Sequence, residues 1–170
     1  MEEIEVPTEH LHEKINELAL EHKEEQNWSY LVAISTALMA VFAAISSLMA
    51  GHYSNEALIE QIKASDQWAY YQAKGIKAEI AGLSRPADSS ALQKYKNQQQ
   101  EIQHVARDFE KESKLYLDKH VVLARSVTFF QIAIAISAIS ILTGRRILWY
   151  GAILLTVTGL IFFIASFFKG

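Results

Sequence analysis

The chain has 170 residues, of which 51% are hydrophobic, 21% are charged and none is cysteine, and its formal net charge is −3 at pH 7. Without cysteine there is no disulfide framework, no thiolate nucleophile and no cysteine zinc site. The balance of acids and bases leaves no strongly basic surface, so we expect no nucleic-acid partner.

Three stretches without charged residues are each as long as a helix that crosses a bilayer. They contain 21, 19 and 22 residues, at 31–51, 126–144 and 147–168, and a spanning helix needs about 20. The sequence therefore predicts an all-α integral membrane protein surrounded by the lipid bilayer. We assign transmembrane helices to residues 28–52, 121–143 and 147–168.

Residues 1–27 form an acidic segment that contains nine Glu and two Lys. A helical pattern follows Pro7 and runs to about residue 26, with an apolar stripe made of Leu11, Ile15, Leu18 and His22. Its Glu-rich side argues against docking on anionic lipid, so we expect this amphipathic helix to bind a protein partner. Since the segment has no basic n-region, we interpret the first span as an anchor rather than a signal peptide.

The acidic segment also contains EHLHE at residues 9–13, which brings imidazoles close to carboxylates. The zinc-protease pattern requires His at i and i+4 on one helix face, but Lys14 follows His10 and Asn16 follows His12 at that spacing. We predict a solvated acidic face and no metal site. A phosphate-binding glycine loop and a nucleophile elbow are also absent, so we expect no cofactor, no catalytic residues and no enzymatic activity.

Residues 53–120 separate the first two spans and have a helical pattern interrupted only by SRPADSS at 84–90, where Pro and small polar residues indicate a turn. The two halves are of similar length and would each project on the order of 40 to 45 Å from the bilayer. We predict an antiparallel helical hairpin, forming a coiled-coil stalk outside the membrane.

Apolar stripes differ between the two halves of this hairpin. The second half has one heptad stripe: Leu92, Tyr95, Gln99, Ile102, Ala106, Phe109, Ser113, Tyr116, His120 and Leu123. The first half has two, one formed by Leu58, Ile62, Ser65, Ala69, Gln72, Ile76 and Leu83, and one formed by Ala57, Ala64, Trp68, Tyr71, Gly75, Ala78 and Gly82. Two stripes require two neighbours, so we expect a homo-oligomer, with a folded-back N-terminal helix as the alternative cover.

The short TGRR at 143–146 predicts a tight turn between the second and third spans. Short loops with Arg stay cytoplasmic, which places the N-terminus in the cytoplasm and the hairpin outside. Four basic residues near the second span favour the opposite orientation: Lys111, Lys114, Lys119 and Arg125. We prefer the first orientation because loops longer than about 60 residues translocate largely regardless of charge.

Arg125 and Gln131 are the polar residues that stand out in the second span. An intramembrane ionisable group marks a functional site by default, here a pore between subunits. Arg125 is close enough to the span's end to snorkel, or to pair with an acid such as Asp118, and we prefer this interpretation. Gln131 fits an interhelical hydrogen bond better than a transport ligand.

The stretch IKASDQWAYYQAKGIK at 62–77 places Trp68 about 25 Å beyond the first span, too far for a lipid-facing aromatic belt. Trp68 and Tyr71 share a face with Ala64 and Gly75, where rings fill space beside close backbone contacts. Symmetric pairing about residue 87 or 88 would place Trp68 opposite Ala106 and Arg107, whose guanidinium would stack on the indole. We expect stalk packing or contact between copies, also involving Phe109, with an aromatic site for a cationic or planar ligand as the alternative.

The same stretch, with the preceding SNEALIEQ, resembles the signature region of a bacterial family known as domain of unknown function 4337. EVPTEHLHE, VVLARSVTFFQIAIAISAIS and TGRR followed by LWY are similar to that family as well. The resemblance implies a small, mainly helical bacterial membrane protein with no established activity, and carries over no functional residues. We therefore expect a multi-pass protein of the bacterial inner membrane, acting as a non-enzymatic homo-oligomeric scaffold or interaction module. The alternative is an oligomeric channel or transporter in which Arg125 and Gln131 face the pore.

Overall fold

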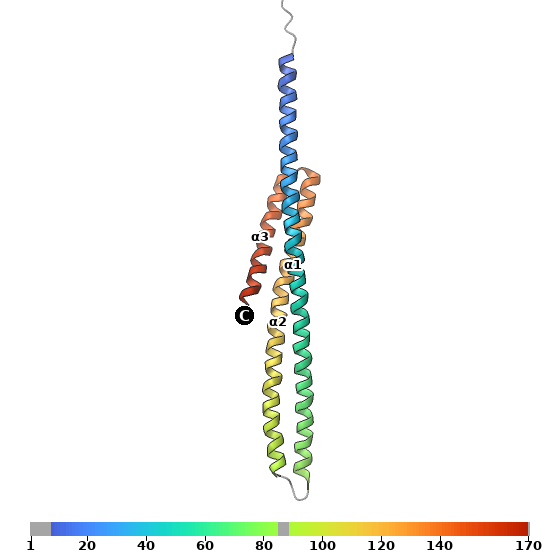
Figure 1. The fold of residues 1–170 in the computed structure, drawn as a ribbon, viewed down its shortest axis with the longest axis vertical. Helices are drawn as coiled ribbons and strands as arrows, with labels where there is room; N and C mark the ends of the chain where they lie inside the picture. Colours follow the sequence, from blue (N-terminus) through green and yellow to red (C-terminus); the bar gives the residue numbers. More distant parts are fainter. Residues whose placement is uncertain (1–7, 85–88, 170) are drawn as a thin grey trace, which may run out of the picture.

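The structure is a computed structural model that describes the backbone of residues 8–84 and 89–169 and the side chains of residues 27–84 and 89–169. The described chain is all-helical and contains three helices, α1 (Thr8–Leu83), α2 (Ser89–Thr143) and α3 (Arg146–Phe168). Figure 1 shows a long, narrow molecule in which α1 and α2 lie side by side and α3 lies beside one half of that pair. Each helix contains a segment long and apolar enough to cross a membrane, as the sequence predicts.

The first helix is continuous over 76 residues, a length of about 114 Å. The chain's two prolines, Pro7 and Pro86, lie just outside its ends, which fits the inability of proline to sit inside a helix without breaking a hydrogen bond. From Thr8 onward, one helix thus continues from the acidic segment into the first apolar segment and the first half of the hairpin. The side chains of residues 1–26 lie outside the described residues, so the N-terminal apolar stripe and the EHLHE group stay predictions.

The helices α1 and α2 pack antiparallel, which confirms the predicted hairpin arrangement. The heptad stripe of α2 faces α1, because Ile102, Ala106, Ser113 and Leu123 are all buried. Small side chains on α1 face them, and both Ala64 and Ala106 are completely buried. Small residues on both sides of the seam allow the two backbones to approach closely over a long distance.

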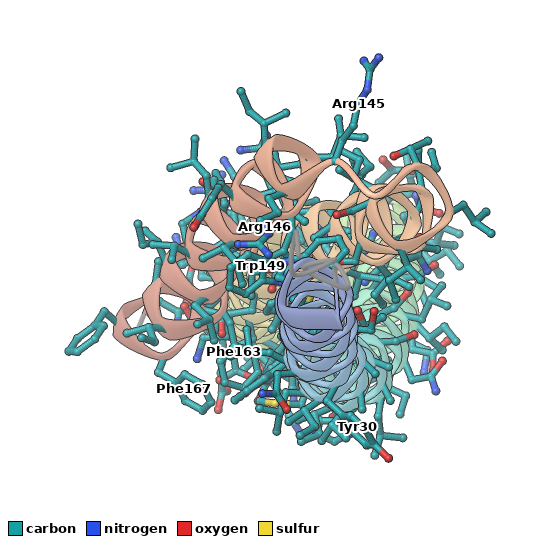
Figure 2. All side chains as sticks on the ribbon, turned by 90° about the horizontal axis from the view of Figure 1, so that it is seen from above. Tyr30, Arg145, Arg146, Trp149, Phe163 and Phe167 are labelled. Atoms are coloured by element: carbon teal, nitrogen blue, oxygen red, sulfur yellow. The ribbon has the colours of Figure 1, made fainter. Side chains whose placement is uncertain are left out.

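The turn after α2 is tight, and Gly144 adopts a φ of 65° there, a conformation that glycine adopts without steric cost. The third helix then folds back along α2, with Met39, Ala133 and Ala152 forming a small buried core where the three helices meet. At the start of α3, Trp149 Nε1 donates a hydrogen bond to Ser35 Oγ at 3.1 Å. Figure 2 shows Arg146 and Trp149 directed towards α1 while Arg145 extends away from the bundle.

Candidate interaction surfaces and intramembrane polar residues

Trp68 and Tyr71 lie in the interface between α1 and α2. Both are partly buried, and their rings meet edge to face with centroids 5.5 Å apart. The indole Nε1 of Trp68 donates a 2.8 Å hydrogen bond to Oε1 of Glu110. The aromatic pair therefore packs within the hairpin, with the polar edge of Trp68 anchored to the facing helix.

The register of the hairpin differs from symmetric pairing about residue 87 or 88. Ser113 Oγ donates to the carbonyl oxygen of Ala57 at 2.8 Å, and His120 Nδ1 lies 2.8 Å from that of Ala50. In each pair the two residue numbers average 85, so the antiparallel pairing is centred on residue 85. The register is therefore set by polar side chains that bond to backbone carbonyls and by small neighbouring residues, and not by the midpoint of the turn.

The neighbours of Trp68 also differ from those expected. Arg107 is exposed on α2 rather than buried against the indole, and Glu110 provides the hydrogen-bond partner instead. Ala106 is completely buried in the seam, and Phe109 is partly buried with the ammonium group of Lys63 5.6 Å from its ring centroid. The structure thus brings Ala106 and Phe109 into the stalk interface and leaves Arg107 outside it.

Gly75 makes room for a polar side chain in the seam. The amide Nε2 of Gln99 donates to the carbonyl oxygen of Tyr71 at 3.2 Å, and a Cβ atom at position 75 would lie 2.8 Å from that nitrogen. A side chain at position 75 would therefore displace the Gln99 amide from this position. Gln99 was recognised in the sequence only as a member of the heptad stripe, and its bond to the facing backbone was not.

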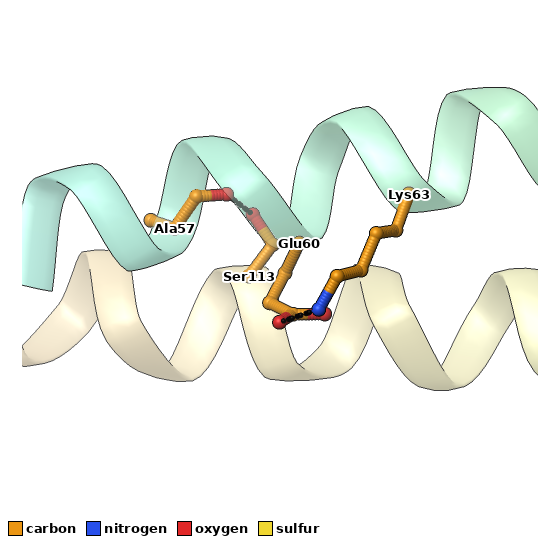
Figure 3. A network of polar contacts seen from close by, with 4 residues as sticks. All are labelled: Ala57, Glu60, Lys63 and Ser113. Carbon is orange, nitrogen blue, oxygen red and sulfur yellow. Dashed lines mark hydrogen bonds and ion pairs between the residues drawn. The ribbon is translucent and has the colours of Figure 1, made fainter.

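Glu60 is a buried carboxylate that sequence reasoning missed (Figure 3). It is 6% exposed, and Lys63 Nζ lies 2.8 Å from its Oε1. This hydrogen bond raises the pKa of Lys63 above its ordinary value. The position carried a signal, because Glu60 is three residues after Ala57 and four before Ala64, on the stripe that faces α2. Figure 3 shows the pair beside the Ser113–Ala57 hydrogen bond.

Inside the three apolar segments, serines supply the buried polar atoms rather than Arg125 or Gln131. Ser46 and Ser126 are completely buried with their Oγ atoms 3.4 Å apart, and Ser126 Oγ donates to the carbonyl oxygen of Gly159 at 2.9 Å. These contacts join α1, α2 and α3 at one position along the bundle. Interhelical serine bonds of this kind stabilise membrane helix packing without exposing polar groups to lipid.

Arg125 and Gln131 are both exposed on the outside of α2. They are six residues apart, which places their side chains about 120° from each other around the helix axis. The structure therefore does not bring them together, and neither faces the packed interior of the chain. Arg125 is two turns from Asp118, whose Oδ2 lies 3.7 Å from Lys169 Nζ.

One of the two apolar stripes of α1 is left open within the hairpin. Leu58, Ile62 and Ile76 are each 59% exposed and Leu83 is 83% exposed, whereas Ala57, Ala64 and Ala78 of the other stripe are buried against α2. The outward surface of α2 is different, because charged and amide side chains dominate it between residues 93 and 114. A contiguous exposed apolar face of this kind is typical of an interaction site.

A family model described as "Domain of unknown function (DUF4337)" matches the chain over residues 28–89 and 84–169. No curated protein and no solved structure matches the chain.

Proposed function

Since the chain belongs to the DUF4337 family, whose description assigns no activity, we propose from its own surfaces that it is a non-enzymatic scaffold or interaction module of the bacterial inner membrane. Three spanning helices anchor it, and the hairpin projects as a coiled-coil stalk that associates with further copies. The N-terminus lies in the cytoplasm together with the turn at Gly144, and the hairpin lies outside. The acidic N-terminal helix offers a separate surface for a protein partner.

The observation that carries this proposal is the contrast between the two outward faces of the hairpin. On α1, the large apolar side chains Leu58, Ile59, Ile62, Ile76 and Ile80 are 45–61% exposed. Exposed surface of this extent beyond the bilayer costs solvation free energy of roughly 25 cal/mol per Å² unless another surface covers it. Because the outward face of α2 is polar, the uncovered apolar side of the stalk lies on α1.

The side chains at the two ends of the apolar segments are consistent with a bilayer around them. At one end the Arg146 guanidinium lies 5.9 Å from the ring centroid of Trp28, and at the other Lys169 approaches Asp118. Aromatic and basic side chains at such levels are typical of membrane–water interfaces. The helix α3 between them has 23 residues, about 35 Å by helix rise, which suits a bilayer.

The main alternative is an oligomeric channel or transporter, and the exposure of Arg125 and Gln131 on an apolar part of α2 is the observation in its favour. Their separation around the helix argues against a single pore lined by both. Planar-bilayer currents from the purified protein that change on Arg125→Ala would support the channel. A protein that assembles in lipid without conducting would support the scaffold.

The test of the scaffold is the mass of the full chain in lipid nanodiscs, measured by native mass spectrometry. We expect an oligomer, and we expect Ile76→Glu to shift it towards monomer. Val105→Glu, at an exposed apolar position on α2, is the matched control and should leave the assembly unchanged. A chain that is monomeric in lipid at every concentration would contradict the proposal.

A further inference from the structure

The open side of α1 follows a heptad pattern that runs without interruption from the membrane into the stalk. Every seventh residue from Leu31 to Ile80, and every seventh from Ile34 to Leu83, falls on one stripe in the alternating three- and four-residue spacing of a coiled-coil seam. All sixteen positions lie in the single helix α1, and all sixteen are exposed. Four residues of the stripe predicted from the hairpin alone belong to this longer surface: Ile62, Ala69, Ile76 and Leu83.

The composition of the stripe is that of a helix interface. Thirteen of the sixteen positions are apolar, and the eleven large side chains among them are 42–83% exposed. They leave on the order of 1,000 Å² of apolar surface open on each copy, compared with about 800 Å² per partner in a stable interface. Five of the eleven lie beyond His52, in the part of α1 that would extend from the bilayer into water.

We propose that this stripe is the seam between two copies of the chain, in which α1 packs in parallel against α1 of a second copy from Leu31 to Leu83. The inference rests on the proposed function, because copies inserted in one membrane with the same orientation must present α1 in the same direction. Each residue of the seam then meets its own counterpart at the same depth.

A second copy fits this surface better than a different partner. A soluble partner would reach only the part of α1 beyond the bilayer, and a partner confined to the bilayer only the part within it. The same stripe continues across that boundary without a change of register. A second α1 provides an identical stripe of the same length, with the same division between its membrane and water portions, and covers both portions at once.

Three polar positions give the seam its specific chemistry. His52, Asn55 and Asp66 lie on the stripe and are exposed in the single chain. In the parallel arrangement the two Asn55 amides face each other and can exchange hydrogen bonds, which fixes register in coiled coils. The two Asp66 carboxylates also face each other, and this like-charge contact weakens the association. An antiparallel pairing would separate both pairs.

The experiment uses single cysteines in the full chain in lipid, which is straightforward because the natural sequence has none. Ile62→Cys, Ile76→Cys and Leu48→Cys place a thiol on the seam, two in the stalk and one in the membrane. Gln61→Cys and Ser47→Cys are exposed neighbours that point about 130° away from it. With a membrane-permeable oxidant we expect the three seam cysteines to convert most of the chains into covalent dimers and the two control cysteines to give only traces.

The outcomes separate the seam from the proposed function. Cross-linking at Gln61 and Ser47 in place of the seam positions, or at the stalk positions without Leu48, would overturn the continuous seam while leaving an oligomeric scaffold in place. A monomer by native mass would overturn both. As a second measurement, Asp66→Ala should shift the monomer–dimer equilibrium several-fold towards dimer, and an unchanged or weaker association would overturn the parallel pairing.

Discussion

Gly159 of α3 packs against Phe130 of α2, and we expect Gly159→Ala to loosen that contact. A Cβ atom at this position would lie 3.1, 3.2 and 3.3 Å from three carbon atoms of the Phe130 ring. The ring has little room to move, because Phe130 is completely buried and stacks on Phe42 with centroids 6.0 Å apart. The added methyl group must therefore displace either the ring or α3.

Two opposing effects determine how much Gly159→Ala changes the free energy of unfolding. Overpacking a close contact costs about 1–3 kcal/mol, while replacing glycine by alanine inside a helix gains about 1 kcal/mol from backbone propensity. Gly151→Ala in the same helix isolates the second effect, because a Cβ atom there would meet nothing within 4 Å. We expect the free energy of unfolding of Gly159→Ala to be lower than that of Gly151→Ala by about 1–3 kcal/mol.

The measurement is thermal unfolding of both variants in the same detergent, followed by circular dichroism. A change of 1 kcal/mol corresponds to roughly 2–4 °C in Tm for a chain of this size, so the two melting temperatures should be clearly separated. Equal melting temperatures for the two variants would refute the argument, because they would mean that Phe130 and α3 adjust to the methyl group without cost.

Three further predictions concern the hairpin. Trp68→Phe should lower the free energy of unfolding by about 0.5–1.5 kcal/mol, measured by denaturation, because a smaller aromatic ring is kept but the bond to Glu110 is lost; a stability equal to the parent's would contradict this. Ser113→Ala should cost a similar amount, about 1 kcal/mol, by the same assay, and an increase in stability would count against the register. The hydrogen bond from Lys111 holds the pKa of Asp108 below its ordinary value, so its contribution to stability is present above the pKa of the unfolded state and is lost as pH falls through the folded pKa. Lys111→Ala should raise the Asp108 pKa in an NMR titration, and an unchanged pKa would refute the assignment.

The helical architecture was predictable because hydrophobic length and breaker residues are local signals. Uncharged stretches of about 20 residues locate the apolar segments, and Pro86 within SRPADSS locates the end of α1 near Leu83. The heptad stripe of α2 also gave the face that packs on α1, as the burial of Ile102 and Ala106 confirms. Such patterns depend on a residue's own helix and need no knowledge of the partner.

The details of the interfaces were less predictable because they depend on two helices at once. Symmetry about the turn suggested Arg107 as the neighbour of Trp68, but the indole donates to Glu110, about two turns along α2 from the residue that pairing centred on residue 85 places opposite Trp68. Long side chains reach along their helices, so helix register alone does not give this contact. Glu60 is buried although a charged residue is normally expected at the surface, and Lys63 pairs with one of its two carboxylate oxygens. Ser46 and Ser126 are eighty residues apart, so no local pattern could have paired them.

The continuity of α1 has a mechanical consequence. A straight helix resists stretching and twisting because every turn is tied to the next by backbone hydrogen bonds, and α1 has no proline between Thr8 and Leu83 to act as a joint. The part of α1 that precedes the first apolar segment and the part that forms the hairpin are therefore joined by one uninterrupted helix, about 114 Å long. A bend between these two parts would have to stretch or break backbone hydrogen bonds of α1 itself.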